Sequence, residues 1–176
     1  MSKSKLKKYL QTLQSEQIIQ VVMDLYDARK EAKEYLEFFL NPDSKEALEK
    51  AKKELFRNYF TPQGRTRAKV STKTGNDIVN NFIRLDTDPE TVADLLVYHI
   101  EVMMSRLLMR HIVGETAWNA LINTFRKAVD YIQAYNMKAL TERRIERIME
   151  FACQTPTYLH IEDRLKQELE EVSFYE

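Results

Sequence analysis

Apolar residues recur with the spacing of α-helices along most of the chain, at positions i, i+3, i+4 and i+7. In the first quarter they predict a short helix, a second helix that Ser15 caps, and a third that is either separate or continuous with the second. Asn41-Pro42 should end the third, because proline disfavours the helical conformation in the residue before it. The apolar positions are Leu6, Tyr9, Leu10, Leu13, Ile18, Ile19, Val22, Leu25, Tyr26, Tyr35, Leu36, Phe39 and Leu40.

The next stretch contains two helices separated by a polar segment. Asp43 and Glu46 have the spacing of a capping box, which predicts a helix that continues to Tyr59. The chain should break at Thr61-Pro62-Gln63-Gly64, and no apolar period is found from there to Thr74. A further helix should follow, and the apolar positions of the two helices are Leu48, Ala51, Leu55, Phe56, Tyr59, Ile78, Val79, Phe82 and Ile83.

The segment from Val92 to Met109 is apolar on nearly every side, which predicts the central, buried helix of the fold. Asp88-Pro89-Glu90 precedes it and has the signature of a helix start: an acidic N-cap, proline at the first position and an acid in the first turn. Gly114 marks its end or a sharp turn. The following helix should bury one continuous stripe, made of Trp118, Leu121, Ile122, Phe125, Val129 and Ile132.

Two shorter helices complete the chain. The first should begin at Thr141 and bury Ile145, Ile148, Met149 and Ala152, and Pro156 interrupts it. The second is an acidic amphipathic segment with Ile161, Leu165 and Leu169 on one face. Phe174 and Tyr175 lie beyond its last periodic residue, so they either fold back onto the body or dock on another subunit.

These patterns predict an all-α protein of about eight or nine helices. The chain has only three glycines and four prolines, the residues that punctuate β-hairpins, so long helices with short connections are favoured. We find no self-similarity at the period of helical solenoids, roughly 34 to 47 residues. A compact multi-helix bundle that forms a single domain over residues 1–176 is therefore expected, with an irregular array of α-hairpins as the second choice.

Charge and cysteine content narrow the function classes. The 27 basic and 27 acidic residues cancel, so no overall field favours nucleic acid or a membrane. Cys153 is the single cysteine, so the chain cannot form an internal disulfide. We expect Cys153 to be a small core residue. The basic N-terminus is not followed by the apolar run of a secretory signal, and no stretch approaches the roughly 20 apolar residues of a membrane span. We expect a cytoplasmic protein that does not enter a membrane.

A basic segment is the most specific candidate for a binding site. Arg65, Arg67, Lys69 and Lys73 alternate with small residues just before a predicted helix, whose first amides could face an anion. The region from 45 to 73 holds nine lysines and arginines against three acids, which suits the phosphates of nucleic acid or another anionic ligand. Nearby Tyr59 and Phe60 either stack on bases or belong to the core. The alternative is a solvated basic loop and helix face.

Metal and catalytic chemistry find little support in the sequence. His99 and Glu101 are two residues apart and diverge on a helix, and His111 and Glu115 fall near its end, so the spacing of zinc ligands is not met. A buried His99 that hydrogen-bonds to a neighbouring helix explains that residue equally well. We identify no nucleophile elbow and no phosphate-binding glycine loop. Cys153 is near His160 in the sequence, but no pattern predicts the lowered pKa that a thiol nucleophile needs. No cofactor or metal is expected, and an enzyme is the less favoured class.

A resemblance to a known family is carried by two stretches of the chain. The first is Leu25–Leu36 with Phe38–Pro42, and the second is Asp94–Glu101. They resemble a family of small all-helical bacterial proteins, common in Bacteroidetes and known only as a domain of unknown function. The similarity covers roughly residues 1 to 135, whereas Ser105–Glu115 and the last forty residues depart from it. The resemblance implies an all-helical fold in the bacterial cytoplasm and supplies no activity.

The leading hypothesis is therefore a non-enzymatic helical module that binds another protein or a second copy of itself. Its motivation is the large helical surface with aromatic and methionine-rich faces. Met103, Met104, Met109 and Met149 either fill an irregular core or line a groove for a partner helix. The rival hypothesis is nucleic-acid or anionic-ligand binding through residues 65–73.

Overall fold

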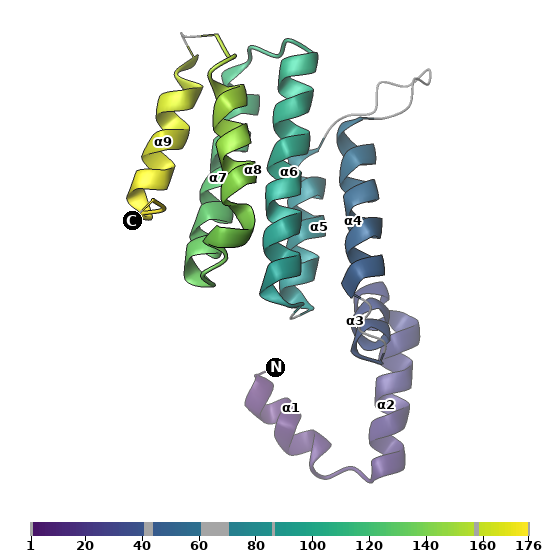
Figure 1. Cartoon of the computed structure of the whole chain (residues 1–176). Helices are drawn as coiled ribbons and strands as arrows, with labels where there is room; N and C mark the ends of the chain where they lie inside the picture. Colours follow the sequence, from purple (N-terminus) through teal and green to yellow (C-terminus); the bar gives the residue numbers. More distant parts are fainter. Residues whose placement is uncertain (1, 41–43, 61–70, 86, 157–158, 176) are drawn as a thin grey trace, which may run out of the picture. The chain divides into compact units, whose positions relative to one another are not determined.

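The computed structural model describes residues 2–40, 44–60, 71–85, 87–156 and 159–175, and within these ranges it contains nine α-helices and no strand (Figure 1). The expected all-α class is confirmed, as is the expected number of helices. The helices are α1 (Lys3–Leu10), α2 (Ser15–Ala28), α3 (Lys30–Leu40), α4 (Ser44–Tyr59), α5 (Thr72–Arg84), α6 (Pro89–Met109), α7 (Glu115–Ala134), α8 (Lys138–Ala152) and α9 (Ile161–Glu171).

The chain divides into two compact units, residues 1–43 and residues 44–176. The first unit holds α1 to α3, of which α2 and α3 pack against each other. The second unit holds α4 to α9 and the hydrophobic core. The expectation of one domain over residues 1–176 stays a prediction.

Helix α6 is the centre of the second unit. It lies between α4 and α8, and α5 and α7 also pack on it, while α9 packs on α7 (Figure 1). The prediction of a central buried helix is confirmed, because α6 is buried around most of its circumference, and only the face of Asp94, Tyr98, Glu101 and Ser105 is partly exposed. The buried residues are Val92, Ala93, Leu95, Leu96, Val97, His99, Ile100, Val102, Met103, Met104 and Leu107. Even so, none of the described helices combines the length and the apolar character needed to cross a membrane.

Local sequence explains where α6 and α7 begin. Asp88 caps α6, since its Oδ1 accepts a hydrogen bond of 2.9 Å from the backbone N–H of Thr91, and Pro89 occupies the first turn. This predicted start is confirmed. Gly114 is the N-cap of α7, five residues beyond the end of α6 at Met109. The predicted stripe of α7 is buried in full.

The predicted start of α8 and the predicted cap of α2 are wrong, and the structure decides whether α2 and α3 are continuous. Helix α8 begins at Lys138, before Thr141, because the Thr141 hydroxyl donates to the carbonyl of Met137 (3.0 Å) and is satisfied inside the helix. The N-cap of α2 is Gln14 rather than Ser15, and its N–H donates to the side chain of Gln17 (2.9 Å). Arg29 has an extended backbone, so α2 and α3 are separate helices. The expected stop at 41–42 and the cap at 43 lie outside the described residues.

The C-terminal aromatic residues take different positions. Phe174 folds back into the core, where it is 1% exposed and its N–H donates to the carbonyl of Leu169. Tyr175 stays largely exposed. The prediction of Cys153 as a core residue is wrong, because α8 ends at Ala152, which takes the buried position, and Cys153 is exposed.

Candidate functional site

A buried polar pair lies at the contact of α4 and α6. The ring of His99 is wholly buried, and its Nε2 lies 2.8 Å from the hydroxyl of Tyr59, so the expected hydrogen bond to a neighbouring helix is confirmed. Burial lowers the pKa of His99 to about 4. Burial also raises the pKa of Tyr59 to about 12, although a hydrogen bond with Thr72 and the charge of Arg106 act in the opposite direction. Both side chains are therefore neutral at pH 7.

Helix α5 approaches this pair at Gly75. A Cβ at this position would lie 2.5 Å from His99 Nε2 and 2.9 Å from the Tyr59 hydroxyl, which is closer than real carbon contacts allow. Glycine is thus required by close packing, since it lets the first turn of α5 sit directly on the two rings.

A cavity of about 190 Å³ opens beside His99, between α5, α6 and α7. Its buried wall includes the apolar side chains of Val79 and Leu96, and Lys127 and Asn80 lie at its exposed edge. The Nδ1 atom of His99 is buried and has no hydrogen-bond partner. The full lining is Asn76, Val79, Asn80, Ile83, Leu96, His99, Thr124, Lys127 and Tyr131.

A network of four charged side chains joins α4, α6 and α8. Lys52 donates to Asp94 (2.7 Å), and Arg144 donates to the other oxygen of Asp94. Arg144 also makes a two-pronged contact with Glu101, through its Nε and Nη2, at 2.7 Å each. Burial favours a higher pKa for Asp94, but the bonds from Lys52 and Arg144 outweigh it and hold the pKa below its usual value. The network thus ties α4 and α8 to α6.

Replacing Arg144 by methionine should lower the free energy of unfolding by about 1–2 kcal/mol, because Glu101 loses its partner and Asp94 keeps only Lys52. The expected cost is below that of a fully buried pair, since the Arg144 side chain is 27% exposed. Chemical denaturation measures it. The matched control is Lys166→Met, which removes the exposed pair with Glu162 and should leave the midpoint nearly unchanged. Equal midpoints for the two variants would contradict the role of the network.

The predicted basic site is described only in part. Arg65, Arg67 and Lys69 lie outside the described residues, and Lys73 is exposed in the first turn of α5. One of the amides expected to face an anion is already satisfied, because the Ser71 side chain accepts from the Thr74 N–H (3.1 Å). Tyr59 belongs to the core. Binding of nucleic acid or another anion by residues 65–73 stays a prediction.

The histidine and carboxylate residues considered for metal binding do not converge. His99 bonds Tyr59, Glu101 bonds Arg144, and His111 is exposed beyond the end of α6. Within the ranges that the structure describes, no three His, Cys, Asp or Glu side chains are grouped as metal ligands.

Sequence reasoning missed both the cavity and the charged network. A signal for the network was present, since Asp94 and Glu101 are the acids of the apolar stretch 92–109 and lie seven residues apart, on one face of a helix. The basic partners could not be assigned, because Lys52 and Arg144 come from helices more than forty residues away. Both acids belong to the segment that carries the family resemblance.

Comparison with known proteins gives a family and no function. Residues 1–168 match the profile described as "Family of unknown function (DUF6155)". The match extends beyond the similarity expected over residues 1–135 and includes most of the C-terminal segment that was expected to depart. No curated protein and no solved structure matches the chain.

Proposed function

The chain belongs to this family of unknown function, and from its own residues we propose that it is a non-enzymatic helical interaction module that binds a second copy of itself through residues 1–43. The observation that carries the proposal is the exposed apolar surface of these residues. Among the described residues of α1 and α2, none is buried. Large apolar side chains are exposed on all three helices, up to 62% at Ile19, 72% at Phe39 and 73% at Leu40.

Short helices with such surfaces need a packing partner. Isolated helices of fewer than about 12–15 residues are marginal in water, and most of their stability in proteins comes from burying an apolar face. Helix α1 has 8 residues and α3 has 11. Leu6 and Tyr9 of α1 are exposed, as are Val22 and Leu25 of α2. Covering these faces would supply the burial that the unit lacks.

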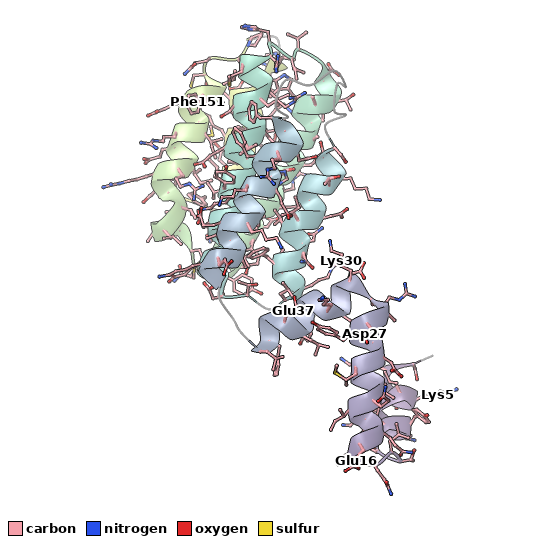
Figure 2. The ribbon with its side chains drawn as sticks, turned by 90° about the vertical axis from the view of Figure 1, so that its right-hand side faces the viewer. Lys5, Glu16, Asp27, Lys30, Glu37 and Phe151 are labelled. Atoms are coloured by element: carbon pink, nitrogen blue, oxygen red, sulfur yellow. The ribbon has the colours of Figure 1, made fainter. Side chains whose placement is uncertain are left out.

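Charge favours a second copy as the occupant. Helix α1 carries four lysines and no acid, whereas α2 carries three acids and no lysine or arginine. Residues 1–43 hold seven basic and seven acidic residues, so two copies do not repel each other overall. In a two-fold dimer each α1 can lie on the α2 of the partner copy, and the same favourable contact is made twice. Figure 2 shows Lys5 on α1, and Glu16 and Asp27 at opposite ends of α2.

The test is a pair of charge-reversal variants studied by sedimentation velocity. In Lys5→Glu/Lys7→Glu/Lys8→Glu, the charge of α1 changes from +4 to −2 and repels the acidic α2, so the homodimer should weaken about tenfold or more. In Glu16→Lys/Asp24→Lys/Asp27→Lys, the charge of α2 changes from −3 to +3 and repels the basic α1, so this homodimer should weaken in the same way. An equimolar mixture should dimerise again, because one contact joins the two altered helices with opposite charges and the other joins two unaltered helices.

A matched control places the same charge change in the second unit. Lys50→Glu/Lys53→Glu/Arg57→Glu alters three exposed positions on α4 and should leave dimerisation unchanged. Wild-type protein that stays monomeric at all concentrations would overturn the proposal. Dimers that tolerate both reversed variants would also overturn it, because association would then use another surface.

We propose the bacterial cytoplasm as the setting of the protein. The support is the resemblance carried by Leu25–Pro42 and Asp94–Glu101, together with the exposed thiol of Cys153, which has no second cysteine in the chain to pair with. An exposed thiol of this kind persists in a reducing compartment.

A further inference from the structure

The cavity between α5, α6 and α7 combines three features that define a ligand. It has a volume of about 190 Å³, a wholly buried lining residue, His99, whose Nδ1 has no hydrogen-bond partner, and a cationic side chain, Lys127, at its exposed edge. All its lining residues belong to the second unit. We propose that this cavity binds a small aromatic monocarboxylate that carries a hydroxyl group on the ring.

The volume sets the size of the ligand. An apolar cavity of about 150 Å³ admits benzene, so about 190 Å³ leaves room for one aromatic ring with small substituents. Cofactor and drug-sized ligands require roughly 300–1,000 Å³ and are too large. The cavity therefore selects a single ring.

The walls of the cavity suit a flat, apolar ligand. Val79 from α5 and Leu96 from α6 are buried in the lining, and Ile83 of α5 extends the apolar wall toward solvent. The ring of Tyr131 adds an aromatic face on α7, where it stacks on Tyr135 at 4.3 Å between centroids. An aromatic ring fills such a site with dispersion contacts on both faces.

At the buried end, the ligand should have a neutral group that can both donate and accept a hydrogen bond. A neutral imidazole has a hydrogen on one nitrogen, and Nε2 of His99 is engaged with Tyr59. Nδ1 is therefore a lone donor in one tautomer and a lone acceptor in the other, and a buried polar atom without a partner is costly. A hydroxyl satisfies either tautomer, whereas a buried carboxylate would add the larger cost of desolvating a charge.

At the exposed edge, the positive charge of Lys127 favours an anionic group of the ligand. Lys127 and Asn80 are both exposed lining residues, and among the described residues that line the cavity none is acidic. A carboxylate at the edge can accept from both side chains while it stays partly hydrated. The ligand thus lies with its hydroxyl inward and its carboxylate outward.

The test uses 4-hydroxybenzoate, benzoate and tyramine as probes of the full chain. Isothermal titration calorimetry should show the tightest binding for 4-hydroxybenzoate, weaker binding for benzoate, which lacks the inner hydroxyl, and the weakest for cationic tyramine. Long-range ¹H–¹⁵N spectra should show a shift of the His99 Nδ1 resonance with 4-hydroxybenzoate. Absence of binding by 4-hydroxybenzoate at millimolar concentration, or binding without a shift of that resonance, would overturn the proposal.

Two variants locate the site. Ile83→Trp fills the cavity edge and should abolish binding, and Lys127→Glu should weaken 4-hydroxybenzoate binding about fivefold or more. Lys53→Glu, an equal charge change on α4, should bind like the wild type. Circular dichroism checks that each variant is folded. If folded Ile83→Trp and Lys127→Glu both retain wild-type affinity, the ligand binds elsewhere and the assignment fails.

Discussion

Lowering the pH from 7 to 4 should reduce the free energy of unfolding by about 3 kcal/mol through His99 alone. Burial lowers the pKa of His99 from 6.5 to about 4, so the unfolded chain binds a proton that the folded protein excludes between these values. A group with a depressed folded pKa stabilises the fold above its unfolded pKa, and this contribution is lost as the pH falls toward 4. Urea unfolding at a series of pH values measures the slope.

The control for this slope is a pair of histidine variants. His99→Leu removes the titrating ring and should flatten the slope between pH 4 and 6.5, even though it also lowers stability at pH 7 by leaving the Tyr59 hydroxyl without its partner. His111→Asn changes an exposed residue with a left-handed backbone, which asparagine tolerates, and should keep the wild-type slope. Equal slopes for wild type and His99→Leu would contradict the burial of a neutral ring.

Replacing Gly75 by alanine should lower the free energy of unfolding by about 1–2 kcal/mol, although alanine is the better helix former. The new Cβ would meet His99 Nε2 at 2.5 Å, and overpacking of a well-filled interior costs about 1–3 kcal/mol. Separating His99 from Tyr59 would remove about 1 kcal/mol more. These losses exceed the roughly 1 kcal/mol that alanine gains over glycine inside a helix. Thermal and chemical denaturation measure the difference.

Gly114→Ala is the matched control for this substitution. A Cβ at Gly114 meets no atom within 4 Å, and the residue has a negative φ that alanine adopts without strain. Its cost should be a few tenths of a kcal/mol, the usual difference between glycine and alanine at an N-cap. A stabilised Gly75→Ala variant would show that α5 does not pack closely against His99 and Tyr59.

The sequence predicts the features of this fold that depend on neighbouring residues. The start of α6 at Asp88-Pro89 follows from capping chemistry, and its burial follows from apolar residues on nearly every side. The sequence pattern predicts the start of α8 at Thr141, and a threonine at a helix start can act as a cap. Its hydroxyl instead bonds a carbonyl of the preceding turn, and a sequence pattern cannot separate these two uses.

The cavity and the charged network depend on how distant helices pack, which amphipathic stripes do not specify. Asp94 and Glu101 could be placed on one face of α6, but their partners required knowing that α4 and α8 lie on either side of it. The sequence allows His99 as a metal ligand or as a buried hydrogen-bonded residue. Only the approach of Tyr59 from α4 decides it.

The most direct test of the central proposal is an intermolecular paramagnetic relaxation measurement between two copies of the chain. A spin label at Ser4→Cys on α1, in a Cys153→Ser background, is mixed with unlabelled ¹⁵N chains that carry the same Cys153→Ser change. The proposal predicts broadening of amide signals in α2 of the ¹⁵N copies. Undiminished α2 signals at concentrations where the protein is dimeric would contradict it, because the two copies would then meet through another surface.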